Sequence, residues 1–226
     1  MATKMCFFVD NTKVFEEKII TFDYIKGMAF SQKQKNVLSF HASIQKQYPS
    51  LKILEISTKS NNSIGVSLSA FNLKLNGFPV ESIFQSGKVF ADGTQYEFLK
   101  SYPPKEAKQY IATNNNSIIK CFRYESLEFP TEPKSMFYDY IYINALNQIP
   151  NISGRLREYD IFTDIEFNEK KQINCQARAC AIYSYMLRTN YVDYYLSSLE
   201  KFKELYGTEE TAQQLSFIWK QQTPAL

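Results

Sequence analysis

The sequence places a carboxylate, an amide and an amine at regular spacing in Glu81, Gln85 and Lys88. Residues 80–90 follow Pro79 and repeat apolar side chains at helical spacing, so they predict a helix. In that helix the three polar side chains share one stripe, because residues four and seven apart lie on one face. Such a stripe can bind or deprotonate a substrate, or it can simply face water. Spacing alone favours the solvated stripe.

A second candidate constellation is acidic. Asp160, Asp164 and Glu166 occur within seven residues. If this segment is extended, side chains two residues apart point to one face, so Asp164 and Glu166 are expected to lie together. Repulsion between two close carboxylates raises one pKa, which keeps a carboxyl group protonated as an acid near neutral pH. An exposed acidic loop is the alternative interpretation.

Two further segments carry groups that can hold an anion. Ser57 and Lys59 follow a predicted strand, and their hydroxyl and ammonium groups can contact a pyrophosphate. Asn174 is the expected N-cap of a helix over residues 174–188, and a helix N-terminus attracts negative charge. A solvated loop around Lys59 is the alternative to the phosphate site.

The predicted helix over residues 135–147 carries two polar residues on an otherwise apolar and aromatic surface, Asp139 and Asn144. Burying a carboxylate or an amide without partners is costly. We therefore expect these two side chains to be exposed, paired with another polar group, or functional.

Composition excludes several classes of protein. The 226 residues are 44% hydrophobic and 22% charged, as in an ordinary globular domain. The net charge of +3 permits a phosphate-rich ligand but does not indicate a basic DNA-binding patch. With one histidine, His41, and four cysteines that lack Cys-x-x-Cys spacing, we expect no metal site, no histidine-based triad and no cofactor. No apolar run could span a bilayer and no signal peptide begins the chain, so the expected location is cytoplasmic.

The order of elements predicts an α+β fold, mainly helical, with a small β-sheet and one cleft. Residues 1–50 are expected to form an N-terminal extension packed on the core, and residues 51–226 the catalytic domain. The extension contains two β-prone runs and a helix over 31–48 whose first turn carries Lys33 and Lys35, in contact with solvent or with a polyanion. Further predicted elements are strands over 51–56, 66–71 and 118–124, and helices from Pro104, over 193–206 and over 209–220.

Taken in order, several short motifs carry a resemblance to a known family. They are residues 56–60 and 65–71, the stripe from Glu81 to Lys88, residues 102–108, 137–146, 162–168 and 173–178. Together they resemble the NADAR family, in the branch found as the antitoxin beside DarT-type DNA ADP-ribosyltransferase toxins. The resemblance covers roughly residues 50–190.

The resemblance implies removal of ADP-ribose from guanine bases in DNA, by hydrolysis of the N-glycosidic bond. It implies that Lys88 is the nucleophile and forms a Schiff base with the ribose. Glu81 then orients the ribose or shuttles protons, and Asp164 protonates the departing base or activates water. A neutral Lys88 amine requires an apolar surround, which we expect from Phe84 and Val89.

The resemblance also implies a set of ligand contacts and partners. Tyr138, or its neighbour Tyr140, matches the aromatic residue that stacks on the nucleotide. The expected ligand-binding residues are Ser57, Lys59, Ser69, Phe71, Gln85, Tyr138, Asn144 and Asn174. The expected partners are guanine-ADP-ribosylated DNA and a cognate DarT-type toxin. Three alternatives stay open: hydrolysis of a small ribosylamine phosphate, sensing of ADP-ribose or NAD without turnover, and blocking of a toxin by direct contact.

Overall fold

One four-stranded sheet joins the beginning of the chain to its later half. The computed structural model describes residues 1–27, 29–169 and 172–207. The sheet has the order β2-β1-β9-β3. Strand β9 runs antiparallel to β1, with Thr163 opposite Cys6, and parallel to β3. The strands are β1 (Ala2–Phe8), β2 (Glu16–Phe22), β3 (Ile53–Glu55) and β9 (Ile161–Thr163).

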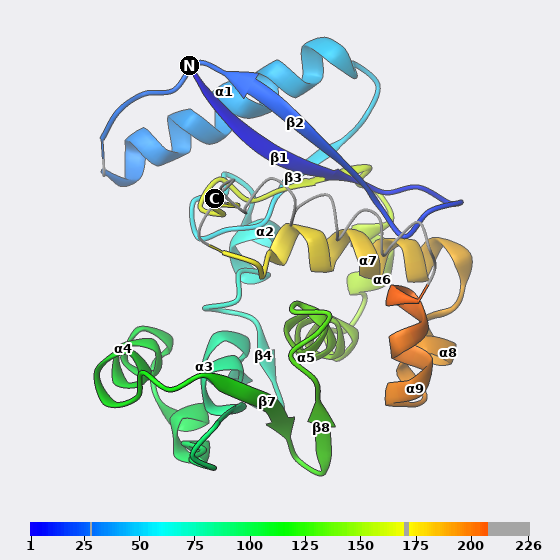
Figure 1. The fold of residues 1–226 in the computed structure, drawn as a ribbon. Helices are drawn as coiled ribbons and strands as arrows, with labels where there is room; N and C mark the ends of the chain where they lie inside the picture. Colours follow the sequence, from blue (N-terminus) through cyan, green and yellow to red (C-terminus); the bar gives the residue numbers. More distant parts are fainter. Residues whose placement is uncertain (28, 170–171, 208–226) are drawn as a thin grey trace, which may run out of the picture.

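Alternating side chains of this sheet supply two separate cores. Phe8 and Ile161 pack with Phe40 under helix α1 (Phe30–Gln47). Phe7 and Phe162 point to the opposite face and join the larger core, which includes α7 (Gln176–Thr189). Figure 1 shows the resulting layers, with α1 on one face of the sheet and α7 along the other.

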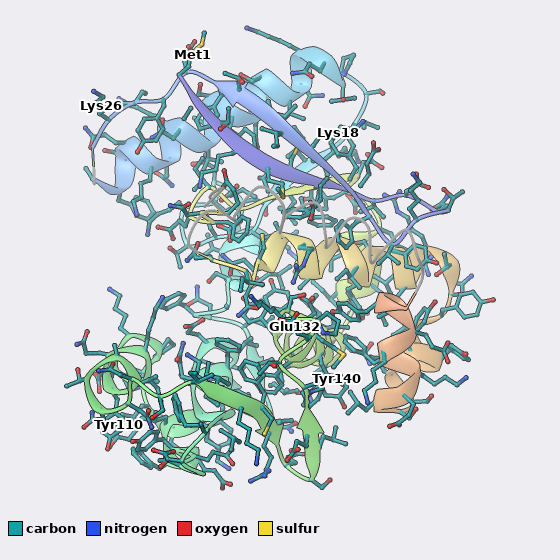
Figure 2. All side chains as sticks on the ribbon, in the orientation of Figure 1. Met1, Lys18, Lys26, Tyr110, Glu132 and Tyr140 are labelled. Atoms are coloured by element: carbon teal, nitrogen blue, oxygen red, sulfur yellow. The ribbon has the colours of Figure 1, made fainter. Side chains whose placement is uncertain are left out.

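Most of the remaining elements form a helical part with two further small sheets, below α7 in Figure 1. Strands β6 (Lys88–Phe90), β7 (Ile119–Tyr124) and β8 (Leu127–Phe129) pair in that order, and β4 (Lys74–Leu75) pairs with β5 (Phe78–Pro79). Figure 2 shows side chains filling the space between the parts, with Glu132 and Tyr140 labelled where β8 leads into α5. The other helices are α2 (Ser63–Ser67), α3 (Val80–Ser86), α4 (Pro104–Asn114), α5 (Met136–Asn147), α6 (Ile152–Leu156), α8 (Val192–Leu196) and α9 (Leu199–Lys203), with 3-10 turns at Glu97–Ser101 and Glu204–Tyr206.

The α+β class with mainly helical content is confirmed, as are the two N-terminal strands and the helix that begins at Pro104. The two strands, β1 and β2, pair as an antiparallel hairpin. The strand predicted over residues 66–71 is wrong. Asn62 accepts a hydrogen bond from the Ile64 backbone N–H and caps α2 there instead. Gly65 lets this helix lie against β3, because a Cβ at Gly65 would come within 1.9 Å of the Glu55 carbonyl oxygen. The helix predicted over residues 209–220 lies outside the described residues.

The helix predicted over residues 80–90 is too long. Helix α3 ends at Ser86, and Lys88 opens strand β6, where it pairs with Phe122. Gly87 follows the helix and allows close packing there, because a Cβ at this position would lie 2.5 Å from the ring of Phe137. Helix α3 therefore ends one turn before the apolar pattern does, at a glycine packed against the aromatic core.

A buried ion pair links α5 to α7, and Asp139 is one of its two members. Both oxygens of Asp139 accept hydrogen bonds from Arg178, at 2.9 and 3.2 Å, and one also accepts from the Tyr206 hydroxyl at 2.7 Å. Asp139 and Arg178 are both almost fully buried. Asp139 is thus a paired residue that holds the C-terminal segment against the core.

We expect Asp139→Ala to destabilise the protein by about 3–5 kcal/mol, because it leaves the Arg178 guanidinium buried without its counter-ion. Glu128→Ala is the matched control. Glu128 also pairs with an arginine, Arg123, at 3.0 Å, but its side chain is 61% exposed, so we expect a loss of about 1 kcal/mol or less. Chemical denaturation of both variants measures the difference, and equal losses would contradict the role of the buried pair.

Candidate functional site

A cavity of about 330 Å³ opens where α3, α5, the turn after α2 and the segment between β9 and α7 meet. Its lining comes from parts of the chain far apart in sequence, because both α3 and the loop after β9 contribute to it. The structure brings eight of the eleven predicted site residues to this cavity: Ser69, Phe71, Glu81, Gln85, Lys88, Tyr138, Asp164 and Asn174.

The polar stripe forms a hydrogen-bonded chain that lines the cavity. The Lys88 Nζ donates to Gln85 Oε1 over 2.6 Å, and Gln85 Nε2 donates to Glu81 Oε1 over 2.9 Å. Gln85 can do both because an amide carries a donor and an acceptor at one end. The stripe therefore does not simply face water, and Gln85 fixes the position of the amine relative to the carboxylate.

Lys88 lies in surroundings that favour the neutral amine. Burial lowers its pKa to about 8, the Glu81 charge opposes that shift, and the Lys108 charge assists it. The ammonium lies 5.1 Å from the ring centre of Phe84, so part of the apolar surround is the one expected. Burial also raises the pKa of Glu81, against the Gln85 hydrogen bond and the charges of Lys108 and Lys88. The buried site therefore brings the two pKa values closer together than they are in water.

Asp164 directly follows β9 and is buried, but its carboxyl partner is not the expected one. Burial and the charge of Glu55 raise the pKa of Asp164, against a backbone hydrogen bond from Glu166. The Glu166 side chain also lines the cavity, but it pairs with Lys33 of α1 at 2.7 Å. The predicted Asp164–Glu166 pair is wrong, because the strand ends at Thr163 and the chain turns there, so the alternation of an extended strand does not continue.

Glu55 has a network of its own behind Asp164. Its two oxygens accept hydrogen bonds from the Ser57 hydroxyl, the Thr163 hydroxyl and the Ile165 N–H. The Thr163 oxygen lies 2.8 Å from the Nε2 of His41, so the single histidine joins this network from α1. Burial raises the pKa of Glu55, and these hydrogen bonds oppose that shift. A charge on Glu55 in turn disfavours a second charge on Asp164.

Two buried polar atoms on the cavity wall lack a hydrogen-bond partner among the described residues, Ser69 Oγ and Asn174 Oδ1. Buried polar atoms are normally paired, so two unpaired atoms on residues that line a cavity suit hydrogen bonding to a ligand or water. The N-cap assignment of Asn174 is wrong by one residue, because α7 begins at Gln176 with Cys175 as its N-cap. Asn174 is thereby left on the cavity wall.

Three predicted contacts lie away from the cavity lining. Ser57 is buried and donates to Glu55. Lys59 donates to the Thr58 hydroxyl and lies 5.0 Å from the ring centre of Phe30. Asn144 donates to the Tyr140 carbonyl one turn earlier on α5.

Tyr138 and Phe71 line the cavity in different ways. Tyr138 is buried and meets Phe84 edge-on with ring centres 5.6 Å apart. Phe71 is 41% exposed, so its ring is accessible at the cavity mouth. Tyr140, the alternative to Tyr138, packs instead against Phe129 and Phe202.

Several polar residues in the lining or directly behind it were missed as candidates, among them Glu55, Thr58, Lys108 and Gln176. Gln176 accepts a hydrogen bond from the Ala70 N–H over 2.7 Å and also bonds to Asp164, so it joins both walls. Lys108 and Gln176 lie within motifs that carry the family resemblance, which could have indicated them. Glu55 carries no such signal, since a glutamate in a short strand usually faces solvent.

Two features are absent from residues 1–27, 29–169 and 172–207: a cluster of metal-binding side chains and a membrane-spanning helix. No cluster of three or more His, Cys, Asp or Glu side chains is placed there to hold a metal ion. No helix in that part of the chain is long and apolar enough to cross a membrane.

Comparison with known proteins places the chain in a family. No curated protein matched the sequence. A family model described as the DarT1-associated NADAR antitoxin matches residues 2–216, which is nearly the whole chain and includes the N-terminal hairpin. The match therefore extends well beyond the 50–190 region of the motifs, and the chain belongs to the family of DarT1-associated NADAR antitoxins.

Proposed function

We propose that this protein removes ADP-ribose from guanine bases in DNA, by hydrolysing the N-glycosidic bond through a Schiff base on Lys88. The observation that carries the proposal is the Lys88–Gln85–Glu81 chain on the wall of a cavity that also holds Asp164. An amine of lowered pKa, on a cavity wall that also carries the half-buried Glu81 and the buried Asp164, can supply a nucleophile and proton donors together. Membership of the antitoxin family supports a substrate made by a DarT-type toxin.

The first half of the reaction exchanges one amine for another. The guanine exocyclic nitrogen is joined to the anomeric carbon, and the furanose opens when its ring oxygen takes a proton, leaving a carbon–nitrogen double bond. The neutral Lys88 amine adds to this carbon. The guanine nitrogen then takes a proton and leaves with its bonding electrons, and the anomeric carbon stays bound to Lys88 as a Schiff base.

The second half restores the lysine. Water adds to the Schiff base carbon, the carbon–nitrogen bond breaks, and ADP-ribose leaves with an aldehyde that closes again to the furanose. The net change is hydrolysis of one N-glycosidic bond. Asp164, whose pKa is raised, donates the proton to the departing guanine, and its carboxylate then takes a proton from the attacking water.

The low pKa of Lys88 matters because only the neutral amine can attack. With a pKa of about 8, about a tenth of the lysine is neutral at pH 7, roughly 300-fold more than for an ordinary lysine. Glu81 holds Gln85, which accepts the Lys88 hydrogen bond and aims the amine. The Glu81 carboxylate also orients the ribose hydroxyls or passes protons during ring opening.

Other lining residues fit the ADP-ribose part of the substrate. The unpaired atoms of Ser69 and Asn174 can bond to ribose hydroxyls or to the diphosphate through Oγ–H and the amide group. The accessible ring of Phe71 can stack on the adenine, a contact that requires an exposed aromatic face. The exposed Lys108 supplies positive charge for the diphosphate.

We expect Lys88→Ala to lower the rate of ADP-ribose release from a guanine-ADP-ribosylated oligonucleotide by about a thousandfold or more, since the nucleophile is lost. Borohydride added during turnover should leave a reduced adduct on Lys88, located by mass spectrometry of the protein. Lys46→Ala, on α1, is the control. It should form the same reduced adduct on Lys88, at the same rate of ADP-ribose release, as the unchanged protein.

The outcomes separate the alternatives. Turnover without an adduct would move the mechanism to water attack assisted by the carboxyl groups, and full activity in Lys88→Ala would contradict the proposed nucleophile. Cleavage of a free ribosylamine phosphate but not of modified DNA would favour the metabolite hydrolase. Binding of ADP-ribose without any turnover would favour the sensor.

The pH dependence tests the electrostatics of the site. Because attack needs neutral Lys88, kcat/KM should rise with pH up to about 8, and it should fall at higher pH as Asp164 loses its proton.

Two variants should move the rising limb of this pH profile, on the low-pH side, in opposite directions. Lys108→Met removes a charge that lowers the Lys88 pKa, so the rising limb should move to higher pH. Glu81→Gln removes a charge that raises it, so the limb should move to lower pH despite a lower rate. Lys46→Met should leave the limb unchanged, and shifts of Lys108→Met and Glu81→Gln in the same direction would refute this account.

A further inference from the structure

A second hollow adjoins the candidate site and has no role in the chemistry described so far. Its volume is about 470 Å³, and it lies against the start of β7 and the segment between β8 and α5. Four residues line both hollows: Phe84, Lys88, Ile173 and Asn174. We call this second hollow the β7 groove. Lys88 therefore stands where the two hollows meet.

The walls of the two hollows differ in chemistry. The candidate site contains Glu81, Asp164 and Glu166, whereas no carboxylate lines the β7 groove among the described residues. The groove is mostly apolar and presents two isoleucines to solvent, Ile118 with 82% and Ile173 with 41% of its surface exposed. Large apolar side chains grouped at the mouth of a groove are typical of a binding surface.

The position of Lys88 decides which part of a substrate each hollow can take. A nucleophile must reach the anomeric carbon, and the ADP-ribosyl group and the base extend from that carbon in different directions. The polar hollow offers hydroxyl, amide and ammonium groups for ribose and diphosphate. The groove offers the ring of Phe84 and aliphatic side chains, which suit the flat face of a base, and it offers no carboxylate to repel a phosphate.

We propose that the β7 groove receives the modified base and the nucleotide next to it, so that the DNA strand leaves the site across Ile118. The proposal rests on the proposed function, because it places the guanine that Lys88 releases. The base lies nearer Lys88, against Phe84, and the neighbouring nucleotide lies at the outer rim. The groove thereby distinguishes a modified strand from a free ADP-ribosylated nucleoside.

The experiment compares two substrates, an ADP-ribosylated oligonucleotide and ADP-ribosylated guanosine. Ile118→Glu places a negative charge where we expect the DNA strand to pass. Because Ile118 is exposed, we expect the substitution to change the stability of the fold very little. We expect kcat/KM for the oligonucleotide to fall about tenfold or more, through repulsion of the phosphates, and the value for the nucleoside to stay within about twofold. Added salt should reduce the loss on the oligonucleotide, because it screens an exposed charge.

Ile19→Glu is the matched control, since Ile19 is also an exposed isoleucine, 54% accessible, but lies on β2 in the N-terminal sheet. It should leave both substrates unchanged. Equal effects of Ile118→Glu on the two substrates, or no effect on either, would overturn the groove proposal while the hydrolase function stands. If the unchanged protein cleaves neither substrate, the proposed function itself fails, and the groove proposal fails with it.

Discussion

Phe84 packs against Phe122 and Phe137 in a cluster of nearly parallel rings, with centres 5.0 to 6.0 Å apart. This cluster fixes α3 against β7 and α5, and it holds Lys88 over the face of Phe84. It also packs closely against the end of the helix, because Gly87 lies against Phe137 where no larger residue fits. The packing that removes Lys88 from water is therefore the same packing that sets its direction, and its lowered pKa follows from that burial.

The other half of the site depends on the four-stranded sheet. Strand β9 lies between β1 and β3, so the N-terminal hairpin and the strand before α2 together decide where Asp164 leaves the sheet. The short parallel pairing puts Glu55 beside Thr163, which is why a second carboxylate lies behind Asp164. The first strand thus belongs to the sheet that positions the site, and the family match from residue 2 agrees with this arrangement.

Much of the site could be predicted because its residues lie in short local motifs. The polar stripe survives although the helix ends before Lys88. Lys88 is the first residue of β6, so it is still close enough to Gln85 for the chain from Glu81 to Lys88 to form. Three predicted contacts instead bond to residues close by in the chain, namely Ser57, Lys59 and Asn144. The sequence does not reveal whether such a side chain takes a local partner or faces a cavity. The strand expected over residues 66–71 failed because a cap at Asn62 and close packing at Gly65 outweighed β-propensity.

By itself the sequence determined the α+β class, the family resemblance and the polar stripe, because periodicity and residue type are local properties. It also limited Asp139 to three outcomes, exposure, pairing or a functional role, since burying an unpaired carboxylate is costly. Only the tertiary structure decided that the partner is Arg178, that Asp164 lies beside Glu55 rather than Glu166, and that Lys88 separates two hollows of different polarity. These facts depend on contacts between distant segments and on the water they exclude, and no local pattern in the chain encodes either of them.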